Sequence, residues 1–170
     1  LKFHNYGDIN RTAMEEHLAE GALYARNAAG NVNVHFTVSK EHLPYFKQLV
    51  SEKQSDYEKK FNVKYSVSFS EQKPSTDTIA ADMQNEPFRD NGKLVFRHGA
   101  LIENLNDIDA DVIFIKNIDN VVPDKIKDST VLFKKIIGGV LISLQQQIDK
   151  YVELLESGKY TMDNVREIIT

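Results

Sequence analysis

Two runs of alternating side chains, separated by a helical pattern, constrain the fold of this chain most. Residues 32–38 alternate between apolar and polar side chains, and so do residues 63–69. Between them, Ser39 and Pro44 open a stretch whose apolar residues recur at helical spacing as far as residue 61. Strand, helix and strand at this spacing predict a βαβ unit with parallel strands and a right-handed crossover.

Further elements are expected on both sides of this unit. Thr12 followed by Glu15 forms a capping box, which predicts a helix over residues 12–27 that is closed by Gly30. Residues 70–90 are polar and irregular, as in a functional or mobile loop. The remaining predicted elements are a helix over 98–106, a buried strand over 112–115, a long core helix capped by Asp128 or Ser129 and ended by Gly158, and a last helix over 161–168.

The order of these elements predicts the fold class. We expect one α/β domain over residues 1–170, doubly wound, with a mostly parallel or mixed central sheet and flanking helices. A first strand and its loop are not found before the first helix. The chain is therefore expected to be a fragment of a longer protein, incomplete at its N-terminal end.

Composition excludes several classes of protein. The net charge of −4 argues against a nucleic-acid partner, which usually requires a basic face. The absence of cysteine removes disulfides and thiolate sites and fits a reducing compartment, so we expect a cytoplasmic location. The most apolar run, residues 136–144, is far shorter than the roughly 20 residues that cross a bilayer, so no membrane partner is expected.

An acidic turn follows the expected strand over residues 112–115. Asn117, Asp119 and Asn120 stand just past the end of that strand, where an α/β sheet places ligands and metal ions. One carboxylate there can hold Mg²⁺ together with waters and phosphate oxygens. Because Asn and Asp also favour turns, the residue types leave a metal ligand and a plain turn both open. His35 and His42 lack further ligands nearby, so no zinc site is predicted.

Several segments resemble the UDP-sugar pyrophosphorylases, which make UDP-sugars from UTP and a sugar 1-phosphate. The resemblance rests on His98-Gly99-Ala100-Leu101, on Asn117-x-Asp119-Asn120 and on Ser68-Phe69-Ser70-Glu71-Gln72-Lys73-Pro74. Residues 85–89 and 92–96 resemble a β-hairpin insertion between these motifs. The whole chain looks closest to an uncharacterised bacterial family that is distantly related to those enzymes.

The resemblance implies a set of site residues. Gln72 would read the uracil base, Lys73 would reach a phosphate, and Asp119 would hold Mg²⁺. His98, Gly99 and Asn117 would also contact the nucleotide, with Lys73 and His98 as the catalytic pair. A plainer reading stays open for each position: Gln72 and Lys73 as solvated loop residues, and His98-Gly99 as a glycine turn with an exposed histidine.

The function implied by the resemblance is Mg²⁺-dependent transfer of a nucleotidyl group, uridylyl in that family, from a nucleoside triphosphate to a sugar 1-phosphate. The glycine-rich loop of those enzymes does not occur in the chain and is expected upstream of Leu1. Arg97 also runs directly into His98, where a Pro-Gly-Gly stretch is expected, so residues are predicted to be missing there. A nucleotide-sugar binding or structural module without turnover is therefore the alternative.

The predicted sheet order also places the site. Asp119 and His98 are expected to face one cleft at the carboxyl edge of the sheet, with Gln72 on its rim.

Overall fold

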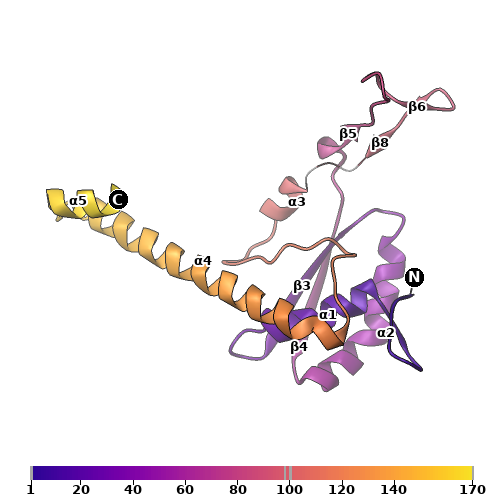
Figure 1. The fold of residues 1–170 in the computed structure, drawn as a ribbon, viewed down its shortest axis with the longest axis horizontal. Helices are drawn as coiled ribbons and strands as arrows, with labels where there is room; N and C mark the ends of the chain where they lie inside the picture. The colour runs from indigo at the N-terminus through magenta and orange to yellow at the C-terminus, as the bar shows by residue number, and fades with distance from the viewer. Residues whose placement is uncertain (1, 98, 100, 170) are drawn as a thin grey trace. The chain divides into compact units, whose positions relative to one another are not determined.

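The computed structural model of the chain describes residues 2–97, 99 and 101–169, without the side chains of Thr76 and Arg97. It is a mixed α/β structure with small sheets and several helices (Figure 1). The chain divides into two compact units, residues 1–121 and 122–170. The expectation of one domain over residues 1–170 stays a prediction.

The predicted βαβ unit is present in the first unit. Strand β3 (Asn31–Val38) leads into helix α2 (Leu43–Phe61), which returns to strand β4 (Lys64–Glu71). The strands pair in parallel, with His35 opposite Ser68. They lie side by side in Figure 1, and the parallel pairing confirms the prediction from alternation.

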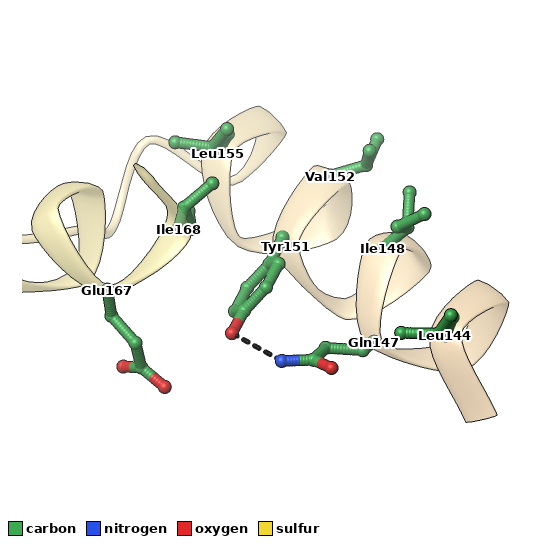
Figure 2. A pocket seen from close by; sticks show the side chains of 8 residues that line it. All are labelled: Leu144, Gln147, Ile148, Tyr151, Val152, Leu155, Glu167 and Ile168. Carbon is green, nitrogen blue, oxygen red and sulfur yellow. Dashed lines mark hydrogen bonds between the residues drawn. The ribbon is translucent and has the colours of Figure 1, made fainter. Parts of the chain in front are cut away.

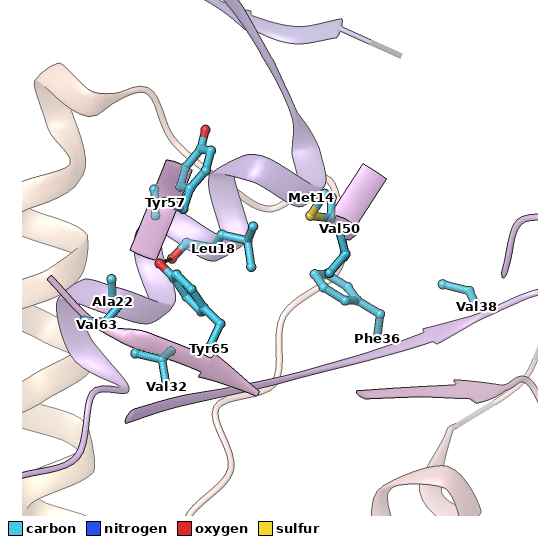
Figure 3. Packing of buried hydrophobic residues seen from close by; sticks show 11 residues of the cluster. Met14, Leu18, Ala22, Val32, Phe36, Val38, Val50, Tyr57, Val63 and Tyr65 are labelled. Atoms are coloured by element: carbon cyan, nitrogen blue, oxygen red, sulfur yellow. Dashed lines mark hydrogen bonds between the residues drawn. The ribbon is translucent and has the colours of Figure 1, made fainter. Parts of the chain in front are cut away.

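The β3–β4 pair has one apolar and one polar face, because successive side chains of a strand point to opposite sides. The apolar face carries Val32, Phe36 and Tyr65 and is covered by both α1 (Ala13–Tyr24) and α2. Figure 3 shows buried side chains of the two helices meeting those of the two strands. The buried core consists of Met14, Leu18, Ala19, Ala22, Val32, Phe36, Val38, Val50, Tyr57, Val63 and Tyr65.

Helix α1 begins at the predicted capping box. The Thr12 hydroxyl accepts from the backbone N–H of Glu15 at 3.3 Å, and the Glu15 carboxylate accepts from the N–H of Thr12 at 2.8 Å. The helix ends at Tyr24, three residues earlier than expected. Gly30 does not cap it: with a φ of 82°, Gly30 closes a separate turn by donating to the carbonyl of Asn27, and the chain then enters β3.

Helix α1 approaches β3 closely at Gly21. A Cβ atom built on Gly21 would stand 3.2 Å from Val32 Cγ1 and 3.5 Å from Val34 Cγ2. The missing side chain therefore permits the short distance between this helix and the strand.

Two glutamates of α1, one turn apart, are fully buried. Glu16 accepts hydrogen bonds from Tyr6 at 2.6 Å and from Arg11 at 3.4 Å, and its Oε1 lies 3.2 Å from His4 Nδ1. These partners come from the segment that precedes α1. The buried carboxylate thus ties the start of the chain to the helix.

The second buried glutamate, Glu20, pairs with a residue that follows the expected strand over residues 112–115, and that expectation is wrong. These residues are all described and form no strand. Instead, Lys116 forms an ion pair with Glu20, and the ring of Phe114 lies 5.1 Å from that of Tyr24. The segment therefore packs against α1 and not into the sheet. The burial of Tyr24, together with the charge of Glu20, raises the pKa of this tyrosine.

A hairpin forms between residues 89 and 94, within the polar region where the resemblance suggested one. Asn91 and Gly92 both have positive φ at its turn, 48° and 79°, as a type I′ hairpin requires. Of the helix predicted over 98–106, Ile102–Asn106 is helical and Gly99 and Leu101 are not, while positions 98 and 100 lie outside the described residues. The short elements of the first unit are β1 (Lys2–Asn5), β2 (Asn10–Thr12), η1 (Pro74–Thr76), β5 (Thr78–Ile79), β6 (Arg89–Asp90), β7 (Lys93–Leu94), β8 (Phe96–Arg97) and α3 (Ile102–Asn106).

The second unit consists of a short turn η2 (Asp124–Ile126), the long helix α4 (Lys127–Glu156) and helix α5 (Met162–Ile169). The two helices confirm the predicted elements. Their details differ: neither predicted residue caps α4, since Ile126 holds the N-cap position without a side-chain hydrogen bond.

The prediction that α4 is a core helix is also wrong. Most of its apolar side chains are exposed, with Ile137 at 63% and Leu144 at 52%. In the part of the chain that the structure describes, no helix has the length and apolar character needed to span a bilayer.

Candidate functional site

The polar face of the β3–β4 pair carries a hydrogen-bonded network near the carboxyl ends of the strands. His35 lies between two serines of β4, with Nδ1 at 2.8 Å from Ser68 Oγ and Nε2 at 2.9 Å from Ser70 Oγ. Ser70 Oγ is also 3.1 Å from the hydroxyl of Thr37. The carboxyl ends of parallel strands are where α/β sheets place ligands, so this network occupies the expected edge.

The network depends on the register of the two strands. Because Thr37 pairs with Ser70 and His35 with Ser68, the three hydroxyls and the imidazole fall on one face. Burial lowers the pKa of His35 below its ordinary value of 6.5. A neutral imidazole donates from one nitrogen and accepts at the other, which suits a position between two hydroxyls.

Asn104 of α3 joins this network from another element. Its Nδ2 donates to Ser70 Oγ at 3.0 Å and to the carbonyl of Glu71 at 2.8 Å, and its side chain is 1% exposed. The amide thereby fastens α3 to the carboxyl end of β4. Its Oδ1 is buried and has no hydrogen-bond partner among the described residues.

Gln72, the predicted base-reading residue, lies at the same edge. Its backbone N–H donates to the carbonyl of Val38 at 3.0 Å, so the pairing of the strands continues one residue past β4. By the alternation of a strand, its side chain belongs to the same face as that of Ser70. The Oε1 atom of Gln72 is buried and, within the described residues, is without a hydrogen-bond partner.

Lys73, the predicted phosphate ligand and catalytic residue, forms an ion pair. Its Nζ lies 2.6 Å from Asp107 Oδ2 and donates weakly to the carbonyl of Glu103 at 3.4 Å. Ser75 also donates to the Glu103 carboxylate at 2.8 Å. These contacts add two more links between α3 and the segment after β4, and they bring Gln72, Lys73 and Asn104 into one neighbourhood.

Asp119 and Asn117 lie in a turn. The carbonyl of Asn117 accepts from the N–H of Asn120 at 3.0 Å, and Asp119 is exposed. The turn follows the irregular segment that packs on α1, and Ile118 at its start accepts from Nε2 of His17 at 3.0 Å. Among the described residues, no group of three or more His, Cys, Asp or Glu side chains is arranged to hold a metal ion.

Several predictions depend on His98. His98 lies outside the described residues, so its catalytic and nucleotide-binding roles, the shared cleft with Asp119 and the missing residues after Arg97 stay predictions. Gly99 is described and half-buried, in the irregular stretch before α3.

A concave surface lies in the other unit, between α4 and α5. It is an open groove of about 430 Å³ whose lining is mostly apolar. Figure 2 shows Leu155 and Ile168 approaching each other across it, Gln147 donating to the Tyr151 hydroxyl at 2.8 Å, and the Glu167 carboxylate pointing away. None of the predicted site residues that the structure describes lines this groove, and its side chains offer little chemistry for a phosphorylated ligand.

The sequence motifs do not indicate the network of His35, Ser70 and Asn104 at this edge of the strands. Ser70 enters the sequence analysis only through the resemblance and His35 only as a metal ligand, and Asn104 is not among the predicted site residues. The signal that was present is the alternation itself, since it places His35, Thr37, Ser68 and Ser70 on one face.

Comparison with known proteins gives a family but no relative of established activity. No curated protein and no solved structure matches the chain significantly. A family model described as a domain of unknown function, DUF4301, matches residues 1–170. The resemblance to the UDP-sugar pyrophosphorylases therefore stays a hypothesis carried by the motifs. Because the family model spans every residue of the sequence, the chain belongs to the DUF4301 family.

Proposed function

We propose that this chain carries the nucleotide-binding part of a Mg²⁺-dependent sugar-1-phosphate nucleotidyltransferase, with uridylyl as the transferred group. The observation that carries the proposal is the buried, unpaired Oε1 of Gln72 at the carboxyl edge of β4. A buried acceptor without a donor costs about 1–3 kcal/mol, so such an atom is unusual unless a ligand or water completes it.

Uracil supplies the group that this acceptor lacks. The N3–H of uracil is a donor between two carbonyl acceptors, and a glutamine amide offers one acceptor and two donors. Gln72 Oε1 accepting from N3–H would satisfy the buried atom and read the base in one contact. This matches the role that the resemblance gives to Gln72.

The phosphates would be held by Lys73. Its ammonium group now pairs with Asp107, whose side chain is 62% exposed, so a triphosphate would compete with a solvated carboxylate for this charge. Positioning and electrostatic stabilisation carry phosphoryl and nucleotidyl transfer, and no covalent intermediate with the protein is needed.

Asp119 and Asn117 are the residues that would hold the cation. Both offer oxygen atoms, which Mg²⁺ prefers, and both are exposed in one turn, where the ion can keep several waters. When bound, Mg²⁺ would neutralise charge that develops as pyrophosphate leaves. The residues present therefore fit the ion chemically.

The test is pyrophosphate release from UTP and a panel of sugar 1-phosphates by the full-length protein, with and without Mg²⁺. Asp119→Asn is expected to reduce turnover at least about 100-fold, because one ligand charge is lost. Asp109→Asn, the same change at another exposed loop carboxylate, should retain activity. Turnover that survives both EDTA and Asp119→Asn would rule out the metal role.

The alternative is a nucleotide-sugar binding module without turnover. The ion pair between Lys73 and Asp107 favours it, since a lysine already neutralised contributes less to a developing phosphate charge. Binding of UMP or UDP-sugars that depends on Gln72, without pyrophosphate release under any condition, would support this function over the transferase.

A further inference from the structure

We propose that Asn104 is a second recognition residue of the nucleotide site, and that its Oδ1 accepts a hydrogen bond from a ribose hydroxyl. The inference rests on the proposed function, because it takes the ligand to be a nucleotide whose base is read by Gln72. It adds a contact, and a selectivity for ribose, that the motifs do not indicate.

The orientation of the Asn104 amide is fixed by its partners. The carbonyl of Glu71 can only accept, so the amide atom 2.8 Å from it must be the Nδ2 donor. The same nitrogen donates to Ser70 Oγ at 3.0 Å. The Oδ1 of a side chain that is 1% exposed is thereby left as a pre-positioned acceptor.

The place of this acceptor suggests the ribose. Glu71, to which Asn104 is hydrogen bonded, directly precedes Gln72 in the chain. Ser70, the other partner of Asn104, belongs to the same strand face as Gln72. The group next to the base in a nucleotide is the ribose, which is bonded to it.

The chemistry of the acceptor excludes the other part of the nucleotide. Phosphate oxygens are acceptors, so they would repel Asn104 Oδ1 and leave it without a donor. Ribose hydroxyls donate, and Oδ1 is a neutral acceptor that can take such a donor without a change of charge. A ligand hydroxyl therefore completes the buried amide, and a phosphate does not.

The experiment compares ligands that differ by one hydroxyl. Binding of UMP, 2′-deoxy-UMP and 3′-deoxy-UMP to the full chain is measured by isothermal titration calorimetry. We expect at least one deoxy form to bind about tenfold more weakly than UMP, as loss of a single buried hydrogen bond predicts. N3-methyl-UMP lacks the N3–H donor of the base and should bind more weakly than UMP. This difference should disappear when the Gln72 amide is removed.

Two variants separate recognition from the fastening of α3. Asn104→Leu removes the acceptor, and the preference for UMP over the deoxy forms should disappear. Ser70→Ala also loosens the contact between α3 and β4 but keeps Oδ1, so the preference should persist. Circular dichroism spectra establish that both variants are folded.

The outcomes separate this inference from the proposed function. If UMP binds and N3-methylation weakens it, but the deoxy forms bind as tightly as UMP, Asn104 does not read the ribose and the inference fails alone. The same holds if the preference survives Asn104→Leu, or if Ser70→Ala abolishes it. If no uridine nucleotide binds the folded wild-type protein, both the inference and the proposed function are overturned.

Discussion

Glu58 of α2 accepts a hydrogen bond from the backbone N–H of Tyr65 in β4, over 3.0 Å to its Oε1. Gln54, one turn earlier, donates to the carbonyl of Tyr65, also at 3.0 Å. Both backbone groups of Tyr65 are thus bonded to side chains of α2. Such side chains occupy an edge of the strand that would otherwise be open to another strand. The Tyr65 hydroxyl donates to the carbonyl of Leu18 at 2.7 Å, so this residue joins β4 to both helices.

Removal of the Glu58 carboxylate should destabilise this edge. We expect Glu58→Ala to lower the free energy of unfolding by about 1 kcal/mol, because the N–H of Tyr65 loses its partner. Glu52→Ala is the matched control on the same helix, since that carboxylate accepts from the exposed Gln48 side chain. It should change the free energy of unfolding by less than about 0.5 kcal/mol in urea denaturation. Equal losses in the two variants would contradict the role of Glu58.

The stability of the protein should fall in mild acid through two histidines. Burial lowers the pKa of His17 and of His35 below the ordinary 6.5. The unfolded chain therefore binds protons at a higher pH than the folded protein. The free energy of unfolding should decrease as the pH drops below 6.5 and level off below the folded pKa values.

The double variant His17→Gln/His35→Gln identifies the source of this dependence. It should flatten the change in the urea midpoint between about pH 7.5 and about pH 5.5. Glu58 acts at lower pH, because its hydrogen bond with Tyr65 lowers the pKa of the carboxyl group and the benefit is lost below the ordinary 4.5. An unchanged slope in the double variant would assign the acid sensitivity to other groups.

The ion pair of Lys116 and Glu20 should be far more sensitive to substitution than an exposed pair. The Lys116 side chain is 7% exposed and that of Glu20 fully buried, so Lys116→Met removes the cationic partner of a buried carboxylate and should cost about 3–5 kcal/mol. Lys64→Met breaks a pair whose lysine is 80% exposed, and should cost less than about 1 kcal/mol. Adding Glu20→Leu to Lys116→Met should restore much of the stability in thermal and urea unfolding; a further loss would show that Glu20 acts mainly through other partners.

Apolar truncations should destabilise the protein far more in the core than on α4. Leu18 is fully buried between α1 and the sheet, so Leu18→Ala should cost about 2–5 kcal/mol through the cavity that it leaves. Ile137 is mostly exposed, and Ile137→Ala should change the free energy of unfolding by less than about 0.5 kcal/mol. If Ile137→Ala lowers the free energy of unfolding strongly, and by the same amount at every protein concentration, the Ile137 side chain is buried in solution.

The parts of the fold that could be predicted are those specified by local patterns. The alternation in β3 and β4 determines their faces, and the reciprocal bonds of Thr12 and Glu15 determine where α1 begins. The segment at residues 112–115 could not be predicted in this way. A short apolar run has no period that separates a strand from an extended segment, and its partners Tyr24 and Glu20 are distant in sequence.

The candidate site was predicted only in part for a related reason. Gln72 was found through a motif, but its unpaired Oε1 depends on packing that a motif does not describe. Asn104 reaches Ser70 across 34 positions, and a polar residue in a short helix carries no sign of such a partner. The serines and His35 have the composition of a solvated strand face, and only the parallel register brings them together.

The close approach of α1 to β3 at Gly21 has a consequence for the evolution of the family. A methyl group at this position would press on Val32 at 3.2 Å, so the two positions are expected to vary together. Relatives with alanine or serine at the position of Gly21 should carry a smaller residue where this chain has Val32. The volume shared by these two positions, more than either residue alone, would then be the quantity under selection.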